Sequence, residues 1–210
     1  MGQSCCEKKS SELVKLRERQ KTVLKIVLAI NFAMFFVEFG AGVVSKSSAL
    51  KADSLDMLGD AIVYGFSLYV LHRSDRWKAK AAFLKGVIIV GFATFVLVDT
   101  TLTVFAPTLP IPETMGVVGG LALLANLACL LLLLRHRDDD INMRSTFICS
   151  RNDIISNTGV LLAAWLVGLL NSKWPDVVIG YVIAVLFFKS AWPILRDSVM
   201  QLRQQDLKVY

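Results

Sequence analysis

The chain has 210 residues, of which 55% are hydrophobic, and its formal net charge is +6. With a mean hydropathy of +0.57 it is too apolar for an ordinary soluble domain, which favours a protein that crosses a membrane. The basic residues lie in the tails and in alternate loops rather than in one patch, which argues against a nucleic-acid partner. The four cysteines do not show the disulfide framework of a secreted fold.

Six apolar stretches, each long enough to cross a bilayer, follow one another along the chain. They predict six membrane helices, at about residues 22–44, 49–71, 83–105, 115–134, 145–170 and 175–195. The predicted fold class is therefore an all-α integral membrane protein, with a six-helix transmembrane domain over residues 22–195. A basic N-terminal tail (1–21) precedes this domain, and a short polar C-terminal tail (196–210) follows it.

The distribution of Lys and Arg predicts the orientation of the helices. Basic residues are concentrated in both tails and in two loops, Arg73–Lys85 and Arg135–Arg144, whereas the other three connections offer only Lys46, Lys51 and Lys173. Because cytoplasmic segments of membrane proteins carry the excess of basic residues, both termini are predicted to be cytoplasmic.

The first predicted span contains an acidic residue, Glu38. Within a bundle, this carboxylate could support a nearby site or carry protons. It could equally lie near the outer end of the helix, where it would pair with a neighbouring helix or with water. Both interpretations stay open from the sequence alone.

The second predicted span contains three carboxylates, Asp53, Asp56 and Asp60. Positions i, i+3 and i+7 share one face of an α-helix, so all three can point the same way. A carboxylate that faces lipid costs roughly 2.5–3.5 kcal/mol on insertion scales, so this face must turn toward a protein interior or a water-filled cavity. Intramembrane acids of this kind indicate an ion or proton pathway.

The fifth predicted span repeats the pattern with Cys149, Asp153 and Asn157, which are spaced i, i+4, i+8. If Asp56 and Asp60 face Cys149 and Asp153, four side chains surround one point, as a tetrahedral divalent site requires. Three oxygen donors and one sulfur donor suit zinc best, with cadmium, manganese, iron and cobalt as alternatives. Such a site holds protons when it is metal-free and releases them on binding, which is the basis of metal–proton exchange.

A purely structural role for the acids would need basic partners at the same depth. Lys25 and Lys189 lie near the cytoplasmic ends, so Arg151 is the one serious candidate, and the metal interpretation is favoured. Enzymatic activity is not expected, because the two histidines, His72 and His136, both fall in predicted loops. Neither a zinc hydrolase helix nor a buried histidine base can be built from them. No cofactor is expected, since the metal is cargo.

The stretch Ser48-Ala-Leu-Lys-Ala-Asp-Ser-Leu-Asp-Met-Leu-Gly-Asp and the acidic fifth span resemble the cation diffusion facilitator family of divalent-metal exporters. The resemblance covers about residues 20–198. It implies six helices, cytoplasmic termini, exchange of metal for protons and a homodimer in the lipid bilayer, here expected in a bacterial inner membrane. It also implies a metal site whose residues fall on Asp56, Asp60, Cys149 and Asp153.

The chain departs from that family in two respects. A histidine is common where Cys149 stands, so Asn152 or Asn157 are alternatives for the fourth ligand, and Asp53 and Glu38 are further candidates. The cytoplasmic metal-binding domain usual in the family has no counterpart after the sixth span, so we expect a short form. The alternative function is a metal-binding sensor or accessory protein of the same fold that does not transport.

Overall fold

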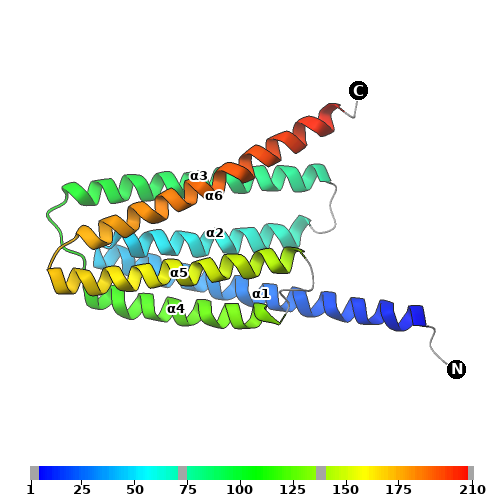
Figure 1. The fold of residues 1–210 in the computed structure, drawn as a ribbon, viewed down its shortest axis with the longest axis horizontal. Coiled ribbons are helices and arrows are strands. Elements are labelled where there is room, and N and C mark those ends of the chain that lie inside the picture. Colours follow the sequence, from blue (N-terminus) through cyan, green and yellow to red (C-terminus); the bar gives the residue numbers. More distant parts are fainter. Residues whose placement is uncertain (1–4, 71–74, 136–140, 208–210) are drawn as a thin grey trace.

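The computed structural model describes the backbone of residues 5–70, 75–135 and 141–207; within these ranges, several side chains are not described, including those of 5–20 and 141–152. The described part of the chain is formed by six helices and contains no strand (Figure 1). The helices are α1 (Cys5–Ser45), α2 (Ser48–Val70), α3 (Asp75–Phe105), α4 (Pro112–Leu134), α5 (Ile141–Leu170) and α6 (Trp174–Leu207). The predicted all-α fold is confirmed.

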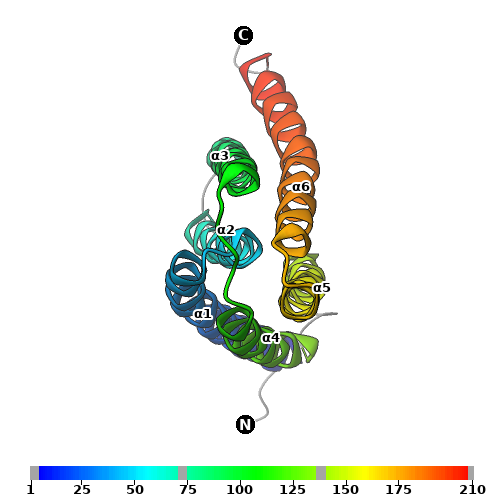
Figure 2. The same cartoon turned by 90° about the vertical axis from the view of Figure 1, so that its left-hand side faces the viewer.

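The helices run alternately up and down, so the Cys5 end of α1 and the Leu207 end of α6 lie at the same end of the bundle (Figure 1). Viewed from the opposite end, α2 lies between α1 and α3, and α5 and α6 face it (Figure 2). The closest packing joins α3 to α6, α1 to α2, and α4 to α5, whereas α2 and α5 touch over only a short length. The second and fifth helices, which carry the predicted ligands, therefore face each other over a small contact area, here called the α2–α5 seam.

Five helices in the described part of the chain are long and apolar enough to cross a membrane, by length and composition. They are the segments Lys21–Ser45, Ala79–Phe105, Pro112–Leu134, Asp153–Leu170 and Trp174–Arg203. Large apolar side chains cover their outer surfaces: Val117, Leu124 and Trp165 are 74%, 65% and 63% exposed. A soluble protein rarely leaves so much apolar surface open, so this chain is a multi-pass membrane protein.

Two helices extend past the spans expected from hydropathy. Helix α1 begins at Cys5 rather than near Thr22, and α6 continues to Leu207. Residues 5–21 contain neither Gly nor Pro, so nothing in the sequence interrupts the helix where its apolar part begins.

The end of the bundle that holds residues 46–47, 106–111 and 171–173, here called the tight-turn end, is fixed by polar contacts. Asp176, in the first turn of α6, is buried and accepts hydrogen bonds from the Ser47 hydroxyl and from the backbone N–H groups of Ser48 (2.8 Å) and Ala49 (3.1 Å). These donors belong to the start of α2, where N–H groups have no partner within the helix. A side chain of α6 thus caps α2.

A second contact at the tight-turn end involves Lys173, just before α6. Its ammonium donates to the backbone carbonyls of Thr103 (3.0 Å), Val104 (2.7 Å) and Ala106 at the end of α3. Carbonyl groups at a helix C-terminus lack partners within the helix and favour a positive charge. The segment that enters α6 therefore holds both α2 and α3.

Candidate metal centre

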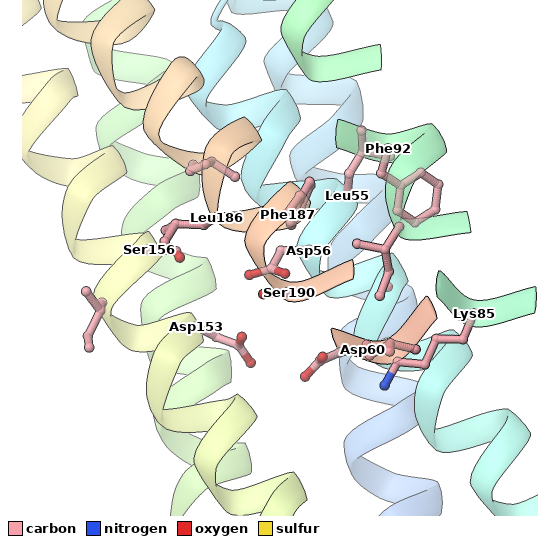
Figure 3. A pocket seen from close by; sticks show the side chains of 15 residues that line it. Leu55, Asp56, Asp60, Lys85, Phe92, Asp153, Ser156, Leu186, Phe187 and Ser190 are labelled. Carbon is pink, nitrogen blue, oxygen red and sulfur yellow. The ribbon is translucent and has the colours of Figure 1, made fainter. Parts of the chain in front are cut away.

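A pocket of about 380 Å³ opens between α2, α3, α5 and α6. Its polar lining includes three carboxylates, Asp56 and Asp60 from α2 and Asp153 from α5. Figure 3 shows Asp153 and Asp60 pointing toward each other across the open space, with Asp56 beside them. The rest of the lining is mainly apolar, with Leu55, Ile89, Phe92, Ile183, Leu186 and Phe187.

Helical spacing explains why these acids meet. Asp56 and Asp60 are four residues apart, so they lie one above the other on one face of α2. Asp153 faces them across the α2–α5 seam. Asp60 is 8% exposed and Asp153 is 7% exposed. Carboxylates so deeply buried in a membrane protein need a compensating cation or proton.

The acids share a pocket, but they are not drawn together around one point. Among the side chains that the structure describes, no three His, Cys, Asp or Glu residues lie close enough to enclose a metal ion. Coordination of one ion by Asp56, Asp60 and Asp153 would therefore require side-chain rotation or closer approach of α2 and α5. The four-ligand arrangement expected from the spacing stays a prediction.

The predicted fourth ligand is Cys149, with Asn152 and Asn157 as alternatives. The backbone of Cys149 and Asn152 lies in α5, but both side chains are outside the described set. Asn157 is buried and does not line the pocket; its amide donates to the backbone carbonyl of Asp153 (2.8 Å) and more distantly to Oδ1 of Asp53 (3.4 Å). This arrangement favours a supporting role for Asn157 at the α2–α5 seam.

Asp53 and Glu38 lie beside the pocket, not in its lining. Asp53 is 1% exposed and Glu38 is fully buried. Seven residues separate Asp53 from Asp60, so Asp53 lies about 10 Å nearer the tight-turn end along the axis of α2. Within the described structure, no other side chain or backbone group donates a hydrogen bond to either oxygen of Glu38 or to one oxygen of Asp53, and the two carboxyl groups lie within reach of each other. These two acids form a buried polar group between α1 and α2.

The structure adds one functional candidate that the sequence interpretation missed. The sequence prediction places Lys85 where a basic loop (73–85) overlaps the start of the third span (83–105); in the structure it lies inside α3 and lines the pocket with the three aspartates. Arg151 is therefore not the one serious basic partner of the acids, because Lys85 lines the same pocket as Asp56, Asp60 and Asp153. A signal was present: Lys85, Ile89 and Phe92 are spaced i, i+4, i+7, and all three line the pocket.

A bundle of membrane helices around an acid-lined pocket defines a multi-pass membrane protein of the ion-pathway class. Comparison with known families agrees with this class. The model of the cation efflux transmembrane domain matches residues 24–202, so the chain belongs to the cation efflux family.

Several characterised proteins are similar to this chain. It is 24% identical over 188 residues to the metal cation efflux system protein CzcD of Cupriavidus metallidurans, covering 84% of this chain and 60% of the relative. It is 25% identical over 194 residues to the zinc transporter ZitB of Yersinia pestis, covering 85% and 62%. It is 22% identical over 193 residues to a cadmium, cobalt and zinc/H(+)-K(+) antiporter of Bacillus subtilis, covering 83% and 62%. The chain thus spans about three fifths of the length of these relatives.

Proposed function

We propose that this protein transports divalent metal cations, zinc foremost, out of the cytoplasm in exchange for protons. The observation that carries the proposal is the pocket in which Asp56 and Asp60 of α2 face Asp153 of α5. Membership of the cation efflux family and relatives named as metal transporters support the same function. In this proposal the ion is cargo, and the three carboxylates are its ligands.

The proposed topology has six membrane spans: the five apolar helices named above and α2. Helix α2 contains too many charged residues to be identified as a span by hydropathy, but its acids line the pocket or lie buried and so avoid lipid. The ends of α1 and α6 lie on one side of the bundle, which agrees with two cytoplasmic termini (Figure 1). We further propose a homodimer in a bacterial inner membrane, as the family resemblance implies.

The choice of metal follows from the donors. Three carboxylates alone would suit hard cations such as manganese, whereas a thiolate from Cys149 would shift the preference toward zinc and cadmium. We propose Cys149 as the fourth ligand, because it lies one helical turn before Asp153.

The test is metal uptake by proteoliposomes that contain the full chain and carry a pH gradient, with zinc, cadmium, manganese, iron and cobalt compared. Gradient-dependent zinc uptake is expected, and Asp153→Asn should abolish it. Asp197→Asn is the matched control, because Asp197 is an exposed acid near the end of α6. Metal binding without flux would favour the sensor or accessory function instead. Equal uptake by Asp153→Asn and the unmodified chain would refute the proposed site.

A further inference from the structure

The acid-lined pocket also contains the side chain of a lysine, Lys85. Among the described residues that line it, Lys85 is the sole basic one, and its partly buried side chain extends from α3 toward Asp60 (Figure 3). Lys80, only five residues earlier on α3, is exposed and lies over the ring of Trp77, 5.7 Å from its centre. The two lysines therefore belong to different environments.

The packing of α3 on α6 fixes the direction of Lys85. The neighbouring residue, Gly86, is pressed against α6: a Cβ atom placed there would come within 2.7 Å of the Leu195 side chain. A larger residue at this position would require the Leu195 side chain to move. Ile89 and Phe92, which follow Lys85 at helical spacing, also line the pocket. Lys85 thus begins a row of α3 side chains that faces the acids.

The charge of the pocket depends on this lysine. Asp56, Asp60 and Asp153 contribute carboxylates to a largely apolar cavity, and Lys85 adds an ammonium group beside them. Without cargo, the same ammonium is the positive group that the carboxylates can bind. The incoming metal and Lys85 therefore compete for the same oxygen atoms.

We propose that Lys85 is a tethered counter-ion that weakens metal binding and promotes metal release. It pairs with the pocket acids when cargo is absent, withdraws when a divalent cation arrives, and returns as the cation leaves. This role rests on the proposed transport function. It predicts an effect opposite to that of a ligand: removal of the lysine charge should strengthen metal binding, since like charges in a poorly screened cavity repel.

The test is zinc affinity of the purified full chain in detergent, measured by calorimetry. Lys85→Met should bind zinc about tenfold more tightly or better, a change of about 1.4 kcal/mol. Lys85→Arg, which keeps the charge, and the control Lys80→Met should stay near the unmodified affinity. In proteoliposomes, Lys85→Met should reach half-maximal flux at a lower zinc concentration and have a lower maximal rate, because release is slower. Damage to the fold would weaken binding, so tightening distinguishes the two effects.

Unchanged or weaker zinc binding by Lys85→Met would overturn the role of Lys85. If that variant aggregates on size-exclusion chromatography, Lys85→Gln removes the same charge and decides the question in the same way. The two proposals fail separately. If the unmodified chain binds zinc and Asp153→Asn does not, the metal site stands whatever Lys85 does. If the unmodified chain binds no metal, both proposals are wrong.

Discussion

At the scale of single residues, the pocket separates acids that look equivalent in the sequence. Asp56 and Asp60 line it together with Asp153, whereas Asp53 lies buried outside it. Burial alone therefore does not identify a ligand, since Asp53 is more deeply buried than Asp60. What distinguishes the three proposed ligands is access to a common cavity.

This distinction gives a binding prediction. Asp60→Asn keeps the side-chain volume but removes a carboxylate ligand. We expect zinc affinity to fall by at least about tenfold, the smallest loss typical when even a group that only supports a metal ligand is removed. Asp53→Asn is the matched control, and its zinc affinity should change by less than about threefold, because Asp53 lies outside the pocket lining. Calorimetry on both variants measures the difference. Equal losses would place Asp53 among the ligands.

The sequence could predict the acids because helical spacing is local information. Asp56 and Asp60 are one turn apart in any helix, and an intramembrane acid must face inward. The place of Lys85 could be predicted only in part. Its helical spacing with Ile89 and Phe92 is a signal for the pocket-facing side of α3, but a lysine that follows a run of basic residues is also typical of a loop.

At the scale of helices, side chains from other helices hold the ends of α2 and α3. Asp176→Ala removes the acceptor for three donors at the start of α2, one of them the Ser47 hydroxyl. We expect a loss of stability of about 2 kcal/mol, since an N-cap acceptor and charged hydrogen bonds disappear together. Thermal unfolding in detergent should show a midpoint several degrees lower. The control is Glu113→Ala, which removes an exposed acid from the first turn of α4 and should change the midpoint little.

The α1–α2 hairpin offers a second test at this scale. A Cβ atom on Gly42 would lie 2.7 Å from Cγ of Lys51 and 2.9 Å from its backbone nitrogen, whereas nothing lies within 4 Å of one on Gly40. Gly42→Ala should therefore destabilise the protein by about 1–3 kcal/mol. Gly40→Ala should be neutral or stabilising by up to about 1 kcal/mol, because alanine favours a helix. The same unfolding measurement compares them, and equal midpoints would contradict the close approach.

At the scale of the whole molecule, the order of helices was predictable and their lengths were less so. Hydropathy marks where a helix can lie in a bilayer, but it does not mark where the helix stops. This is why α1 and α6 extend beyond the predicted spans. The pairing of α3 with α6 could not be predicted, since it depends on which side chains fit together rather than on apolar content.

The proposed topology can be tested by cysteine labelling in cells, on a chain whose four native cysteines are replaced by serine. Glu113→Cys, near the tight-turn end, should react with a membrane-impermeant maleimide from outside. Arg135→Cys, at the far end of α4, should react only after permeabilisation, because one membrane helix separates the two positions. Both side chains are exposed, so access within the protein is equal. The reverse result would invert the proposed orientation.

The two contacts made by the start of α6 have a mechanical consequence. Asp176 fastens α2 and Lys173 fastens α3, so these three helices are pinned together at one end. Helices that are joined at the tight-turn end can separate from one another only at the opposite end, with the joined end as the pivot. Lys85 lies ten residues into α3 from the unpinned end. Tilting of α2, one of the pinned helices, about this pivot would change the gap between its pocket acids and Asp153 of α5, while the pinned end stayed closed.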